Sequence, residues 1–73
     1  MMMLLLVKLR KEKGWSQAAL SRACLMSAST VCAIEGGHMN AYPGQRSKIA
    51  RALDWPEDRA DELFEEVGDG GRD

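Results

Sequence analysis

The chain has 73 residues, 45% of them apolar, and a formal net charge of −1. A chain of this length buries only about 60% of the surface that it exposes when unfolded, so it can form one small core. It is too short for the cleft that an enzyme of ordinary residues needs, and its apolar residues recur at helical rather than strand spacing. We therefore expect one all-α domain, a compact bundle of four to five helices that binds a partner and catalyses nothing.

The net charge averages two opposite parts of the chain. Residues 1–53 carry eight Lys and Arg against two Glu, which gives +6, whereas residues 54–73 carry two Arg against nine acids, which gives −7. A basic body followed by an acidic end is typical of a protein that binds a polyanion with one surface and turns the other away. Ordinary solvated faces are the alternative interpretation of the same pattern.

Three helices are expected in the first half of the chain. Ser16 and Ser27 each stand at an N-cap position, and glycines follow the first and third helical patterns. The expected ranges are 4–13, 16–24 and 27–35. Apolar residues three or four positions apart give each helix an inward face. These inward residues are Leu6, Leu9, Leu20, Ala23, Cys24, Val31 and Ile34.

The second half is expected to contain a loop and two further helices. Gly, Asn and Pro mark residues 36–44 as the loop, and a fourth helix follows over 45–53. A fifth begins at Pro56, which suits the first turn of a helix. Residues 1–67 then form the domain, and residues 68–73 are expected to be a disordered tail because they are rich in Gly and Asp.

The stretch 15–37 carries a motif: Trp-Ser-Gln-Ala-Ala-Leu at 15–20, then Ser-x-Ser-Thr-Val-x-x-Ile-Glu-x-Gly at 27–37. With its flanks, from about residue 4 to 64, the chain resembles the Cro and phage-repressor (XRE) family of helix-turn-helix regulators. The resemblance implies a supporting helix at 16–24 and a recognition helix at 27–35 that enters the major groove of double-stranded DNA. It implies a transcription regulator, a repressor that acts as a cytoplasmic homodimer.

The resemblance also implies roles for single residues. Gln17 starts the supporting helix, where the positive helix end addresses a phosphate; capping or packing is its alternative role. Arg10 and Glu35 are implied to form a partly buried ion pair, with a phosphate contact as the alternative for Arg10. The residues expected to contact DNA are Lys13, Ser16, Gln17, Ser27, Ala28, Ser29, Cys32, Ala33, His38 and Asn40.

Several positions depart from the family pattern. The outer face of the recognition helix has no Arg, Asn or Gln for a bidentate base contact, so we expect low sequence discrimination and more weight on phosphates and DNA shape. Leu25 occupies a turn position that usually holds Gly, so the turn is either strained or differently shaped. Ser21 and Arg46 replace a small and an apolar residue respectively.

A homodimer is expected because one recognition helix touches few base pairs, whereas two helices about 34 Å apart double the contact. Exposed apolar residues near the chain's end are the expected interface, and covering the core is their alternative role. These residues are Trp55, Leu63, Phe64 and Val67.

Other classes of function have weaker support in the sequence. Cys24, Cys32 and His38 lack the close pairing of structural zinc sites, and the chain shows no set of nucleophile, base and orienting group around its single histidine, so we expect no metal, cofactor or small-molecule substrate. The apolar start, Met1 to Val7, lacks a basic leader and is far shorter than a membrane span. The main rival is a helix-turn-helix module for protein interaction, such as an antitoxin or assembly subunit, which the pI of 5.8 favours.

Overall fold

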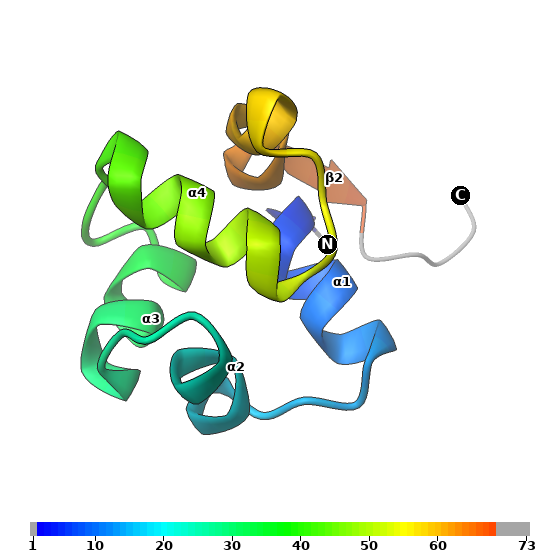
Figure 1. Ribbon diagram of the computed structural model, residues 1–73. Coiled ribbons are helices and arrows are strands. Elements are labelled where there is room, and N and C mark those ends of the chain that lie inside the picture. The colour runs from blue at the N-terminus through cyan, green and yellow to red at the C-terminus, as the bar shows by residue number, and fades with distance from the viewer. Residues whose placement is uncertain (1, 69–73) are drawn as a thin grey trace.

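Short helices follow one another along most of the chain, and the two ends of the described region pair as strands (Figure 1). The computed structural model describes residues 2–68. It contains five helices and one two-stranded sheet, so the prediction of an all-α fold is correct for the helices and wrong for the ends. The elements are β1 (Met2–Leu4), α1 (Leu5–Glu12), α2 (Gln17–Ala23), α3 (Ala28–Glu35), α4 (Pro43–Ala52), the 3-10 helix η1 (Glu57–Phe64) and β2 (Glu66–Gly68).

The small sheet was not expected from the sequence. β1 and β2 pair antiparallel with Leu4 opposite Glu66, and the Leu5 amide donates to the Glu65 carbonyl at 2.9 Å. Backbone N–H and C=O groups need partners, and each short segment supplies them to the other. The first helix therefore begins at Leu5, after β1, and the fifth helix ends at Phe64, so that Val67 lies in β2. The predicted tail lies, apart from Gly68, outside the described residues.

Serine caps start α2 and α3 as the sequence predicts. The Ser16 hydroxyl accepts from the Ala19 amide at 3.0 Å, and the Ser27 hydroxyl accepts from the Thr30 amide at 3.2 Å. Each bond satisfies one of the free amides at a helix start. Both helices thus begin where the motif places them, and α3 ends before the glycine pair as expected.

The later helices differ from their predicted form. α4 starts at Pro43, two residues earlier than expected, because the fixed φ of Pro suits a first helical turn. The Tyr42 amide donates to the Gln45 side chain at 3.0 Å and satisfies the backbone just before it. Pro56 precedes the fifth helix rather than opening it, and this helix is 3-10 with a break at Arg59 (φ −117°, ψ 20°).

One core joins all five helices. Residues from α1, α2, α3, α4 and η1 are almost fully buried in it: Leu6, Leu20, Val31, Ile49 and Leu63. Ile34 and Cys24 are buried as predicted, and Ala50 and Leu53 are buried as well. Ala23 is exposed, so its predicted inward position is wrong. Ser21 is buried instead, and its hydroxyl donates to the Ala18 carbonyl at 2.7 Å, which satisfies it inside the core.

The sequence left open whether the turn between α2 and α3 is strained or differently shaped, and the structure has the strained form. Leu25 has φ +62°, in the left-handed region, and its side chain is 80% exposed. The Met26 amide donates to the Ser21 carbonyl at 2.9 Å, which closes the turn over the end of α2. The backbone geometry is thus one that Gly adopts without strain, although a Leu occupies it.

Replacing Leu25 with Gly is expected to stabilise the fold. A left-handed non-Gly residue costs roughly 1–2 kcal/mol, and Gly costs about 0.5–1 kcal/mol through the freedom that it gives the unfolded chain. We expect a net rise of about 0.5–1 kcal/mol in the free energy of unfolding, measured by urea denaturation. Leu25→Ala keeps the strain and serves as the control. A Gly variant no more stable than the Ala variant would contradict a strained turn.

Candidate nucleic-acid interface

α2 and α3 pack against each other and are joined by the turn 24–27. Figure 1 shows the pair on the side of α4 away from η1. Val31 and Ile34 anchor α3 in the core with 1% and 2% exposure. The opposite side of α3 faces solvent and consists of small side chains. Along it Ala28, Ser29 and Cys32 are exposed and Ala33 is half-buried.

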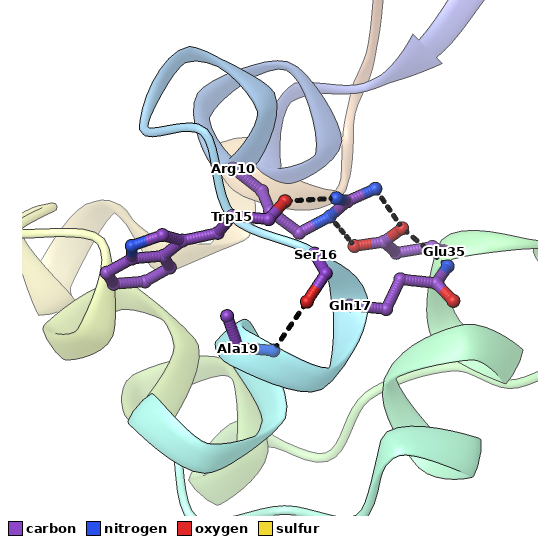
Figure 2. A network of polar contacts seen from close by, with 6 residues as sticks. All are labelled: Arg10, Trp15, Ser16, Gln17, Ala19 and Glu35. Carbon is purple, nitrogen blue, oxygen red and sulfur yellow. Dashed lines mark hydrogen bonds and ion pairs between the residues drawn. The ribbon is translucent and has the colours of Figure 1, made fainter.

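An ion pair fastens α1 to the end of α3 (Figure 2). Arg10 Nε donates to Glu35 Oε2 at 2.8 Å and Nη2 donates to Oε1 at 3.0 Å. The remaining Nη1 donates to the Trp15 carbonyl at 2.7 Å. The side chains of Arg10 and Glu35 are only 10% and 5% exposed, so this bidentate pair is largely shielded from water. Arg10 and Glu35 thus form the pair that the resemblance implies, and Arg10 is oriented inward rather than toward a phosphate.

Gln17 joins the same network. Its Nε2 donates to Glu35 Oε1 at 2.9 Å, and Figure 2 shows its amide turned toward the carboxylate. The residue is half-buried. Its Nε2 is therefore engaged within the protein, and a phosphate contact by this residue stays a prediction.

Of the other expected contacts, the loop residues lie next to α3 and Lys13 does not. His38 and Asn40 are exposed just after α3, and the His38 ring lies against Gly36. Lys13 Nζ is 3.6 Å from Asp54 Oδ2 and 5.2 Å from the Trp15 ring centroid. This lysine is thus engaged near the end of α4, where Asp54 follows the helix.

Most cations of the basic half are neutralised internally. Pairs are formed by Lys8 with Glu12, Arg10 with Glu35, Lys13 with Asp54, Arg46 with Asp61, and Arg51 with Glu57. Within the described part of the chain, Lys11, Arg22 and Lys48 form no ion pair. The +6 of residues 1–53 therefore overstates the free positive charge available to a polyanion.

Lys11 is a cation beside α3 that was not among the residues expected to contact DNA. It is exposed, and it lines a shallow groove of about 410 Å³ between α1 and α3 together with Cys32 and Glu35. The sequence could have pointed to Lys11, because it directly follows Arg10, which was already expected to contact the end of α3.

The two cysteines have different surroundings. Cys24 is 2% exposed, and its thiol donates to the Ser21 carbonyl at 3.7 Å. Burial raises the pKa of the Cys24 thiol above its ordinary value. Cys32 is exposed on α3. No group of three His, Cys, Asp or Glu side chains within residues 2–68 is arranged to hold a metal ion.

This difference predicts selective thiol modification. The thiolate is the reactive form, so the exposed Cys32 is expected to react with an aromatic disulfide reagent in the native protein while Cys24 stays protected. Absorbance of the released thiol should report one equivalent natively and two in denaturant. A Cys32→Ser control should release none until it unfolds. Two equivalents from the native protein would contradict the burial of Cys24.

The residues expected at a dimer interface divide into one core residue and three partly exposed ones. Leu63 is fully buried, so it covers the core and contacts no partner. Phe64 is half-buried, with the Arg46 guanidinium 5.1 Å from its ring centroid. Trp55 is half-buried and its indole donates to the Arg59 carbonyl at 3.1 Å. Val67 is half-buried in β2.

Comparison of the chain with protein-family models, curated proteins and solved structures finds no match. In the described region no helix has the length and apolar character to cross a bilayer. The function therefore has to be inferred from the geometry of the helices themselves.

Proposed function

We propose that the protein is a DNA-binding transcription regulator, a cytoplasmic repressor with the helix-turn-helix fold of the Cro and phage-repressor family. It inserts α3 into the major groove and acts as a homodimer. The observation that carries this proposal is the α2–α3 pair, in which two serine-capped helices meet at a tight turn and the outer face of α3 is open. Helices in this arrangement suit the major groove of B-DNA.

Rigid support of α3 strengthens the proposal. The helix is anchored on one side by Val31 and Ile34 and at its end by the Arg10–Glu35 pair, to which Gln17 is also bonded. A recognition helix has to hold its side chains in fixed positions against base edges, and a helix that is fixed by packing and hydrogen bonds does so. Gln17 in this account positions α3 through Glu35.

The exposed side chains of α3 determine what it can read. Ala28 and Ala33 can contact thymine methyl groups, and the hydroxyls of Ser27 and Ser29 can exchange hydrogen bonds with bases or phosphates. None of these contacts is bidentate, so discrimination among sequences is low. Small side chains also let the helix backbone approach the groove closely, which gives more weight to DNA shape.

Phosphate contacts come from few cations. Lys11 lies beside α3 and is the described cation best placed for a phosphate next to the groove, while His38 and Asn40 offer polar groups in the following loop. Neutralising each phosphate steepens the fall of log affinity with log salt by about 0.9. Lys11 alone gives a slope of about −1 per copy, and all three described cations without an ion pair, Lys11, Arg22 and Lys48, give a limit of about −3.

A protein-interaction module, such as an antitoxin or assembly subunit, is the second candidate. The internal pairing of most cations favours it, as does the 80% exposure of Leu25. Backbone amide chemical shifts distinguish the two candidates when a duplex of about 30 base pairs is added at low salt. Chemical-shift changes concentrated in α3 and residues 36–40 support DNA binding, and no change there would favour the protein-interaction module instead.

A further inference from the structure

The outer face of α3 carries no charged or amide side chain. Its residues lie three or four positions apart, so they are neighbours on one side of the helix. They are Ala28, Ser29, Cys32 and Ala33. The charged residue of α3, Glu35, is held inside the protein by Arg10 and Gln17. The outer face therefore presents two alanine methyl groups, one thiol and one hydroxyl.

The hydroxyls at the start of α3 bond to one another. Ser27 donates to Thr30 Oγ1 at 2.8 Å, and its oxygen accepts from the Thr30 amide at 3.2 Å. A hydroxyl has one proton, so Ser29 is the donor in its 3.3 Å contact with the Ser27 oxygen. Ser27 can therefore bond a base only by giving up one of these partners, whereas Ser29 keeps acceptor lone pairs.

The major groove offers one apolar group to such a face, the methyl on C5 of thymine. Guanine presents two acceptors there and requires donors, which the protons engaged within α3 do not supply. 5-Methylcytosine carries its methyl on the same ring carbon as thymine. Beside that methyl, cytosine has an amino donor where thymine has an acceptor, so the lone pairs of Ser29 suit the methylated cytosine.

We propose that α3 recognises the C5 methyl groups of pyrimidines, so that it takes 5-methylcytosine as well as thymine. Ala28, Cys32 and Ala33 supply the apolar contact, and Ser29 accepts from the amino group of cytosine. This recognition rests on the DNA binding proposed above and names the base chemistry that α3 contacts. Methylation of cytosine then adds contacts to a DNA site without any change in its sequence.

Three duplexes of about 30 base pairs and of one sequence test the proposal. The first has the natural bases, the second has deoxyuridine for every thymine, and the third has 5-methylcytosine for every cytosine. Deoxyuridine pairs as thymine does and lacks only the methyl. Fluorescence anisotropy at low salt is expected to show about three- to tenfold weaker binding of the second duplex and about three- to tenfold tighter binding of the third, the effect of one or two buried methyl groups per copy.

Protein variants separate a methyl contact from a change in DNA shape, which base modification can also cause. The double variant Ala28→Ser, Cys32→Ser places hydroxyls at two exposed positions of α3 with little change in size. It should bind the three duplexes within about twofold of one another. Ala23→Ser makes the same kind of change at an exposed residue of α2 beside α4, and this matched control should keep the full preference.

Equal affinity of the natural protein for the three duplexes would overturn the proposal and leave DNA binding in place. A gain that is absent from the 5-methylcytosine duplex would overturn the assignment of that base. A preference that persists in Ala28→Ser, Cys32→Ser would also overturn it, because DNA shape would then be its cause. No binding to any of the three duplexes would contradict the proposed function itself, and methyl recognition with it.

Discussion

Replacing Glu35 with Ala is expected to lower the free energy of unfolding by about 3–5 kcal/mol. The Arg10 side chain is 10% exposed and directs two of its nitrogens at this carboxylate, so the change leaves a guanidinium shielded from water without a counter-charge. Gln17 loses the same acceptor. The free energy of unfolding of a small domain is about 5–15 kcal/mol in total, so urea denaturation of this variant should show a marginally stable or unfolded protein.

Two controls isolate the buried charge. Glu12→Ala removes an exposed partner of Lys8 on α1, at 3.9 Å, and should cost no more than about 0.5 kcal/mol. The double variant Arg10→Met, Glu35→Leu removes both charges and should recover much of the loss, because apolar residues of similar size need no counter-charge. A Glu35→Ala protein as stable as Glu12→Ala would show that the pair does not hold α1 to α3.

Replacing Ala28 with Glu is expected to reduce DNA affinity about thirtyfold, which corresponds to about 2 kcal/mol. Ala28 is the first residue of α3 and is exposed, so in the proposed complex the new carboxylate faces the acidic duplex. Folding should be unharmed, because a negative charge at a helix N-terminus is favourable by about 0.3–1 kcal/mol. Fluorescence anisotropy with a labelled duplex measures the affinity, and urea denaturation checks the fold.

Lys8→Ala is the matched control for Ala28→Glu. It makes the same change of one unit in net charge, but on α1, where Lys8 pairs with Glu12. We expect a loss of less than about threefold, since screened charges more than about 10 Å from the phosphates contribute little at 0.1 M salt. Equal losses in the two variants would mean that net charge rather than α3 governs binding.

Local signals account for the parts of the fold that the sequence predicted. Ser16, Ser27 and the glycine pair define helix ends through bonds within a few residues, so α2 and α3 were placed correctly. The sheet could not be found in this way, because Leu4 and Glu66 pair across nearly the whole chain and neither short strand carries an alternating pattern.

The candidate site was predictable in outline but not in its electrostatics. The spacing of the motif placed Ala28, Ser29 and Cys32 together on the outer face of α3. Charge counting could not show that Arg46 pairs with Asp61, because those partners meet only after α4 and η1 have packed. Lys11 became the prominent cation near α3 for the same reason, since it is exposed beside the groove between α1 and α3.

The most direct test of DNA binding is the affinity of the natural chain for a mixed-sequence duplex of about 30 base pairs across a salt series, beside Ala28→Glu and the double variant Lys13→Ala, Gln17→Ala. We expect binding at low salt with a log–log slope of about −1 to −3 per copy, and a large loss of affinity in Ala28→Glu. The double variant tests whether the support of α3 affects DNA affinity. Loss of Gln17 should act on affinity indirectly, through the position of α3, and loss of Lys13 should change affinity little. No binding at the lowest salt, or equal binding by Ala28→Glu, would contradict the account.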